Sequence, residues 1–199
     1  MADGFKASVS APPAEIDPDA ALMVRVADGD AAAYRLLVDR HADRLLGFAE
    51  RLVGDRATAE DVVQDSFLSV WRTAASWTPR AKVTTWLYRI VRNKGLDQIR
   101  KRKPTVDPDD VILTDTGAAP DQGLHDRQTA DLVRTAMDGL PERQRSAIVL
   151  VHYENLSGAD ASAALGISVE ALESLLARGR RALREALSGR RQELLETTQ

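Results

Sequence analysis

The sequence predicts an all-α protein that consists of two small helical domains joined by a flexible acidic linker. Three observations lead to this fold class. The chain is rich in helix-forming alanine, leucine and arginine, with only 12 Gly, 8 Pro and 5% aromatic residues in its 199. Apolar residues recur at the three- and four-residue spacing of amphipathic helices in both halves of the chain. Residues 104–127, between these halves, are rich in Pro, Gly and Asp and keep no helical period.

The segment 17–103 is expected to form the first domain, from four helices. Residues 1–16 precede it; they are rich in Ala, Pro and Ser without apolar periodicity, and are expected to be a disordered tail. The first helix covers about 18–28 and ends before a Gly-Asp turn. The second carries an apolar stripe at helical spacing, formed by Tyr34, Leu37, Val38, Leu45, Phe48 and Leu52.

The third and fourth helices complete this domain. The third opens on residues 58–61 (TAED), which have the form of an N-terminal capping box. Its buried stripe is expected to consist of Val63, Phe67, Val70 and Trp71. The fourth helix covers about 84–102, with Gly95 interrupting it, and Pro104 ends the domain.

The second domain is expected over 128–190, after the linker 104–127 and before a C-terminal tail, 191–199. Its clearest pattern is a short helix over 157–165, a tight turn at Gly166-Ile-Ser168 and a longer basic helix over 169–187. Glycine suits the turn, and Ser168 suits the N-cap of the second helix. This pattern is typical of a DNA-binding helix-turn-helix, although structural helical bundles use it too.

Charge is strongly segregated along the chain, although the net charge is only −3. Residues 72–103 contain ten Lys or Arg and one acid, and residues 178–191 contain six Arg and one Glu. Residues 105–131, between them, contain seven Asp and one Arg. One basic patch could be a solvated helix face, but two patches on helical patterns predict two contacts with one polyanion.

Aromatic residues are interleaved with the first basic patch. Trp71, Trp77, Trp86 and Tyr88 lie within eighteen positions, among several Arg and Lys residues. Basic groups neutralise phosphates and exposed aromatic rings stack on unpaired bases, so this pattern favours single-stranded or melting DNA. Trp71 and Trp86 fall on apolar helix faces and are assigned to packing. Trp77, in a loop beside Pro79, is the candidate for an exposed role.

The outer face of the third helix is polar. Asp61, Gln64, Asp65, Leu68 and Arg72 share this face, opposite the predicted buried stripe. An acidic face that carries one leucine is either simply solvated or docks on a basic partner helix, and the pattern alone favours neither.

Several function classes are excluded or disfavoured. The chain has no cysteine, which excludes disulfides and thiolate metal sites. His41, His125 and His152 are far apart, and no phosphate-binding loop or nucleophile motif is present, so no metal, no cofactor and no enzymatic activity are expected. No signal peptide is visible, and the longest aliphatic run, 147–151, is too short to span a bilayer. A cytoplasmic protein without membrane insertion is expected.

Taken together in order, the motifs resemble the extracytoplasmic-function (group IV) sigma factors of bacterial RNA polymerase. The first domain carries AEDVVQDSFLSVW at 59–71, TWLYRIVRN at 85–93 and LDQIR at 96–100, similar to that family's second region. The second carries LPERQR at 140–145, Leu156-Ser157, Leu165–Ser168 and RGRRAL at 178–183, similar to its fourth region. The resemblance covers residues 17–188.

This resemblance implies an alternative sigma factor that binds core RNA polymerase and directs promoter recognition. It implies three partners: core polymerase, through the β′ clamp helices and the β subunit; promoter DNA; and an anti-sigma factor that holds the protein inactive. The face expected to bind core consists of Asp61, Gln64, Asp65 and Leu68. The residues expected near the −10 element are Trp77, Arg80, Lys82, Arg89, Arg92, Asn93, Lys94, Arg100 and Lys101. Those expected to bind −35 DNA are Ser168, Ser174, Arg178, Arg180, Arg181 and Arg184.

The sequence departs from the family pattern at two places in its second domain. Gly158 and Ala159 follow Leu156-Ser157, where many relatives have an aromatic residue. Glu173 and Leu175 stand early in the recognition helix, where relatives often carry basic residues. Glu173 and Leu175 are the reason for considering an alternative function, a sigma mimic that sequesters an anti-sigma factor. A stand-alone helix-turn-helix regulator is a further alternative, which leaves 58–103 without a purpose.

Overall fold

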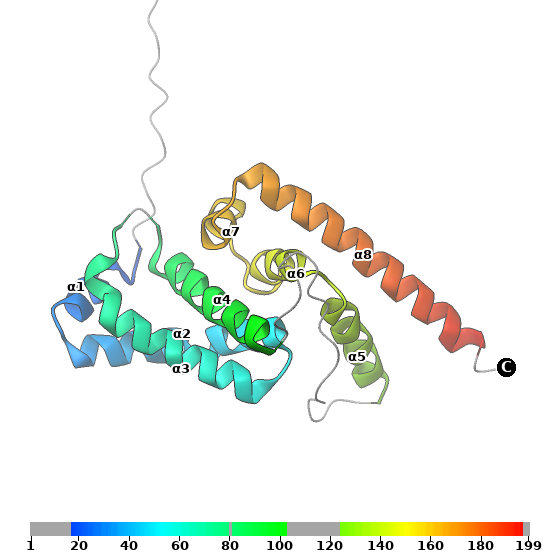
Figure 1. Cartoon of the computed structure of the whole chain (residues 1–199), viewed down its shortest axis with the longest axis horizontal. Helices are drawn as coiled ribbons and strands as arrows, with labels where there is room; N and C mark the ends of the chain where they lie inside the picture. The colour runs from blue at the N-terminus through cyan, green and yellow to red at the C-terminus, as the bar shows by residue number, and fades with distance from the viewer. Residues whose placement is uncertain (1–16, 80, 103–123, 197–199) are drawn as a thin grey trace, which may run out of the picture.

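The computed structural model describes residues 17–79, 81–102 and 124–196, with side chains at 17–79, 81–101 and 131–188. These parts of the chain contain helices and no strand, which confirms the all-α prediction (Figure 1). The elements are α1 (Ala20–Ala27), α2 (Ala31–Val53), α3 (Arg56–Thr73), η1 (Ala74–Ser76), α4 (Val83–Arg102), α5 (Leu124–Asp138), α6 (Glu142–Ile148), η2 (Val149–Tyr153), α7 (Gly158–Leu165) and α8 (Val169–Glu196).

The first helical unit consists of α1 to α4, with α2, α3 and α4 packed on one another. Its core includes Leu37, Phe48 and Leu87, each at most 1% exposed. The sequence suggested that Gly95 interrupts the fourth helix, but α4 continues through it. Gly95 is buried where α4 crosses α2. A Cβ there would lie 2.7 Å from Leu52 Cδ2, so the missing side chain is what permits this close approach.

Aspartates define the starts of the helices in this unit. Asp30 accepts hydrogen bonds from the N–H groups of Ala32 and Ala33 and caps α2. Asp55 accepts from the N–H of Thr58 at 2.8 Å and caps α3. The predicted capping box at 58–61 is therefore wrong, because the helix already begins at Arg56 and these four residues lie inside it.

The second helical unit consists of α5 to α8. Gly179 lets α8 approach α6 closely, since a Cβ there would lie 2.7 Å from Ile148 Cδ1. Arg145 is fully buried beneath this crossing, with Nη1 3.3 Å from Asp138 Oδ1. Burial lowers the pKa of the Arg145 guanidinium, and the nearby Asp138 and Glu142 carboxylates oppose that shift.

The helix-turn-helix is present where the sequence predicts it. α7 ends at Gly166, whose φ of 69° is the left-handed conformation that glycine adopts without strain. Ser168 then caps α8 by accepting from the N–H of Ala171 at 3.2 Å. The ends of this unit differ from expectation: α5 begins at Leu124, ahead of the predicted start near 128, and α8 continues to Glu196, into the predicted tail. The predicted N-terminal tail and residues 104–123 of the predicted linker lie outside the described residues.

The two units pack against each other through α2 and α4 on one side and α6, η2 and α7 on the other (Figure 1). The contact is polar at its centre. Tyr88 on α4 donates a 2.6 Å hydrogen bond to Glu154, and Arg44 on α2 donates to the carbonyl oxygen of the same residue at 2.8 Å. Arg51 lies over the ring of Tyr153, 4.7 Å from its centroid.

Candidate macromolecule-binding surfaces

The polar face of α3 is open to solvent. Asp61, Gln64 and Asp65 are exposed, and Leu68 is 44% exposed beside them. Among the described residues neither Asp61 nor Asp65 has an ion-pair partner. The structure therefore brings the four predicted docking residues together on one face, with two carboxylates available to a basic partner.

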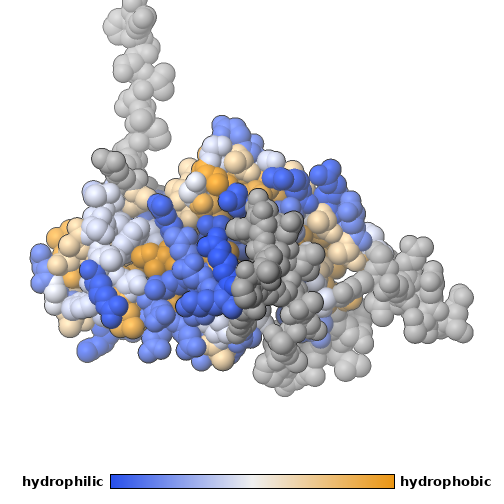
Figure 2. All heavy atoms as spheres, viewed as in Figure 1, coloured by the Kyte–Doolittle hydropathy of each residue, from blue (hydrophilic) through white to orange (hydrophobic). Residues whose placement is uncertain are grey.

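An apolar groove runs beside this face, between α2 and α3. It encloses about 390 Å³ and is lined mainly by Tyr34, Val38, Ala42, Leu46, Phe67 and Leu68. The Tyr34 ring packs edge-on against Trp71, with centroids 5.0 Å apart. Trp71 is nevertheless 39% exposed, so its predicted place in the buried stripe of this helix is wrong: it lies at the edge of the stripe, where it stays partly open to solvent. An apolar groove bordered by carboxylates suits a helix that offers both apolar and basic side chains. Figure 2 shows the visible face of this unit as mostly hydrophilic, with small separate apolar patches.

Trp77 does not have the fully exposed position that the sequence predicted. It is half-buried between η1 and α4 and packs against the core. Its indole Nε1 is buried and finds no acceptor among the described residues. The ring lines an apolar hollow of about 390 Å³ against α1, together with Met23, Val24 and Pro79. Local sequence signals a loop here, but only the packing of α1 explains why the ring turns inward. Arg80 lies outside the described residues.

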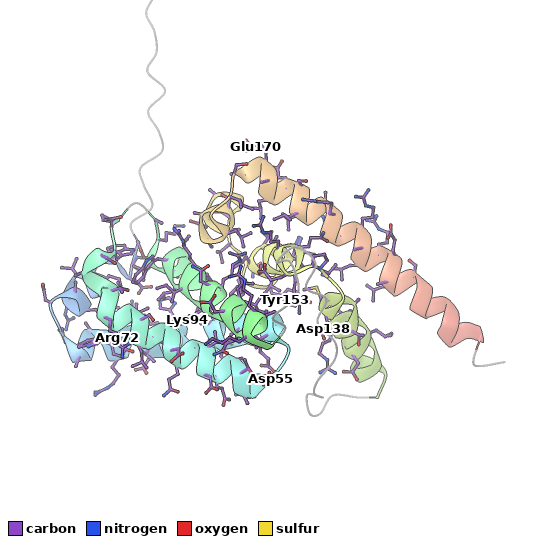
Figure 3. The ribbon with its side chains drawn as sticks, in the orientation of Figure 1. Asp55, Arg72, Lys94, Asp138, Tyr153 and Glu170 are labelled. Carbon is purple, nitrogen blue, oxygen red and sulfur yellow. The ribbon has the colours of Figure 1, made fainter. Side chains whose placement is uncertain are left out.

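The predicted −10 residues of α4 divide into two groups. Arg89, Asn93, Arg100 and Lys101 are exposed, and Lys94 is half-buried on the same helix. Figure 3 labels Lys94 on α4. Arg92 and Lys82 instead face the second unit, as the next contacts show. The structure therefore does not gather all of the predicted residues on one open surface.

Acidic side chains of the second unit form ion pairs with Arg92 and Lys82. Arg92 Nε lies 3.3 Å from Glu142 Oε1, and the Arg92 side chain is only 12% exposed. Lys82 Nζ lies 3.5 Å from Asp160 Oδ2 on α7. Glu142, Glu154 and Asp160 were missed as functional candidates, because no local spacing announces a contact between residues fifty or more positions apart.

The outer face of α8 carries the predicted −35 residues. Ser174, Arg178, Arg180, Arg181 and Arg184 are all exposed. The Ser168 hydroxyl is engaged in capping α8. The pKa of Glu170 is lowered mainly by a hydrogen bond from its own backbone N–H, and further by a hydrogen bond from the Ser168 hydroxyl. Glu170 marks the start of α8 at the top of Figure 3.

The two unusual residues of α8 differ in their surroundings. Leu175 is only 9% exposed and belongs to the core that α8 forms with α6 and α7, so it is not in a position to contact DNA. Glu173 is exposed and precedes the exposed Ser174 in the helix. The apolar residue therefore maintains the fold, and only Glu173 changes the chemistry of the outer face.

Two further classes of site were sought within the described ranges. No cluster of His, Asp or Glu side chains there could hold a metal ion. None of the helices that the structure describes is both long and apolar enough to cross a bilayer.

Comparison with known proteins identifies both helical units. Residues 37–105 match the family model for Sigma-70 region 2, and residues 130–183 match the model for Sigma-70, region 4. The chain is 36% identical over 171 residues to the ECF RNA polymerase sigma factor SigE of Mycolicibacterium smegmatis, covering 81% of this chain and 65% of that protein. It is 36% identical over 173 residues to the ECF sigma factor SigF of Caulobacter vibrioides, covering 84% of this chain and 92% of that protein.

Two solved structures share the fold. CnrH in complex with the cytosolic domain of CnrY superposes with a TM-score of 0.68 at 28% identity, over 86% of this chain and 97% of that one. The sigma factor RpoE in complex with the anti-sigma factor NepR, from Bartonella quintana, gives a TM-score of 0.65 at 27% identity, over 78% and 96% of the two chains.

Proposed function

The chain belongs to the extracytoplasmic-function (ECF) sigma factors of RNA polymerase, and on that premise we propose how its surfaces divide the work of an alternative sigma factor. The observation that carries the proposal is the order of the two matched regions, 37–105 and 130–183, with an open acidic face on the first and a helix-turn-helix in the second. The sigma mimic and the stand-alone regulator each leave one of these features unused.

Core polymerase is proposed to dock on the acidic face of α3. Asp61 and Asp65 would pair with basic side chains of the β′ clamp helices, while Leu68 and the adjoining α2–α3 groove would receive apolar ones. The available carboxylates, the exposed leucine and the groove support this assignment, because an exposed apolar surface rimmed by polar residues is typical of an interaction site.

Promoter DNA is proposed to contact two separate surfaces. The −10 strand would follow the exposed basic side chains of α4, which are Arg89, Arg100 and Lys101, toward the hollow at Trp77. The Trp77 ring, which lines this hollow and is only half-buried, supports a role there, since an aromatic ring can stack on an unpaired base. Duplex −35 DNA would lie along the outer face of α8, where Ser174, Arg178 and Arg181 are exposed.

An anti-sigma factor is a further proposed partner. RpoE, whose fold this chain shares, was solved with the anti-sigma factor NepR. In the proposed role the protein has no catalytic activity of its own, and it acts in the cytoplasm, where core polymerase and the promoters are.

Run-off transcription with purified core polymerase on a library of promoter fragments tests this proposal. Start sites that require the protein are expected, and they should disappear when Asp61→Lys and Asp65→Lys are combined. Charge reversal at Asp131, an exposed residue of α5, is the matched control and should leave transcription intact. Binding to core without any transcript would favour the mimic, and a promoter footprint that needs no polymerase would favour the stand-alone regulator.

A further inference from the structure

One carboxylate joins the starts of two helices that are far apart in the sequence. Asp17, just ahead of α1, accepts a 3.0 Å hydrogen bond from the N–H of Asp19 through Oδ1. Through Oδ2 it accepts a 2.6 Å hydrogen bond from the N–H of Val83, the first residue of α4. Sixty-six positions separate the two partners.

The contact stabilises α4 at the point where the helix needs it. The first N–H groups of a helix have no partner within the helix, and its N-terminus attracts negative charge. Val83 is fully buried, so its N–H would lose water without gaining another acceptor if Asp17 were absent. Asp17 therefore caps the start of α4, although it lies sixty-six positions earlier in the chain.

The same end of the molecule also holds the start of the connection between η1 and α4. η1 packs against α1, and Trp77 lines the hollow that α1 closes with Met23 and Val24. The connection is thus held at both ends, at its beginning by Trp77, which packs beside α1, and at Val83 by the carboxylate of Asp17, just ahead of α1. Because the same connection carries Trp77 and Pro79, which line the hollow, a movement of the start of α4 would change the shape of the hollow.

We infer that Asp17 is a positioning residue for promoter opening: it holds the start of α4, and with it the Trp77 hollow, in the geometry that receives the −10 strand. This inference rests on the proposed function and deepens it. Asp17 does not touch DNA in this scheme, and it acts through Val83 and the connection that ends there.

The test measures promoter opening apart from the other steps. Holoenzyme is assembled from core polymerase and the full chain, on a promoter fragment that the unaltered protein opens. Permanganate reactivity of the −10 thymines reports opening; core affinity and binding to −35 duplex are measured in parallel. The variants are Asp17→Ala, Asp17→Asn, which keeps one acceptor oxygen, and Asp30→Ala, which removes the cap of α2 instead.

Asp17→Ala is expected to reduce opening by roughly 3- to 30-fold, the range that loss of a helix cap implies, at equal core and −35 binding. Asp17→Asn should recover part of that loss. Asp30→Ala should lower the melting temperature without a comparable loss of opening at a temperature where both variants are folded. This contrast separates positioning from general stability.

Two results would overturn the inference. Either Asp17→Ala opens the promoter as well as the unaltered protein, or Asp17→Ala and Asp30→Ala lose opening equally and in step with their stability. Failure of the unaltered protein to open any promoter, although it binds core, would instead remove the proposed function, and the role of Asp17 in it.

Discussion

Tyr88 and Glu154 meet at the centre of the contact between the two helical units, with the phenol oxygen 2.6 Å from the carboxylate. Tyr88 is 3% exposed and Glu154 is 6% exposed, so both groups have left water to make this bond. Arg44 and Arg51 stand 3.6 and 3.9 Å from the same carboxylate. Glu154 belongs to the second unit and all three partners belong to the first, so this carboxylate keeps its protein partners only while the units are together.

Glu154→Ala is expected to loosen the packing of the two units. Removal of the acceptor leaves a buried hydroxyl without a partner, at a cost of about 1–3 kcal/mol. Donor and acceptor dyes on α3 and α8 should show a lower transfer efficiency in the variant than in the unaltered protein. Glu185→Ala, on the exposed face of α8, should change nothing. Equal transfer in all three proteins would show that Glu154 does not hold the units together.

The stability of the packed state should fall above pH 10. Burial raises the pKa of Tyr88 above its ordinary value, and the hydrogen bond and charge of Glu154 raise it further. Between the ordinary pKa of about 10 and the raised one, the unfolded chain loses this proton and the folded protein keeps it. The contribution of the phenol is therefore full below about pH 10 and declines as pH rises toward the folded pKa.

Urea unfolding of the unaltered protein and of Tyr88→Phe measures this decline. The difference in free energy of unfolding between the two proteins should narrow as pH rises above 10. A difference that stays constant through this range would mean that Tyr88 keeps its ordinary pKa in the folded protein.

Gly95→Ala is expected to destabilise the first unit despite the higher helix propensity of alanine. Alanine gains up to about 1 kcal/mol over glycine inside a helix, whereas overpacking a core costs about 1–3 kcal/mol. Leu52 is 1% exposed and has little room to move away from the new Cβ, so the cost should win. Gly158→Ala, where nothing lies within 4 Å, should be neutral or stabilising. Thermal unfolding of both variants tests the opposite signs.

Arg181→Ala is expected to weaken binding to −35 duplex about equally across sequences if its guanidinium contacts phosphate. The dependence of affinity on salt should then fall by about one counterion. Fluorescence anisotropy with labelled duplex at several salt concentrations measures both quantities. Arg134→Ala on α5, whose guanidinium pairs with Asp131, is the matched control. A loss confined to one sequence would assign Arg181 to a base instead.

Short-range features of this fold were predictable from the sequence. Glycine at 166 and serine at 168 fix the turn and the cap of the helix-turn-helix through their own chemistry, and the buried Val63, Phe67 and Val70 of α3 follow a simple periodicity. The features that sequence reasoning missed depend on residues distant in the chain. Trp77 turns inward because α1 covers it, and Arg92 is masked because Glu142 arrives from the other unit. No pattern within one helix contains that information.

The boundary of the folded unit differs from the boundary of the recognisable motif. Similarity to region 2 begins at residue 37, yet the acceptor for the first N–H of α4 is Asp17. A fragment cut where the similarity begins would lack α1, expose the apolar wall behind Trp77 and leave the start of α4 without its cap. Dissection of this protein into domains should therefore keep residue 17, and a fusion partner or affinity tag belongs upstream of it.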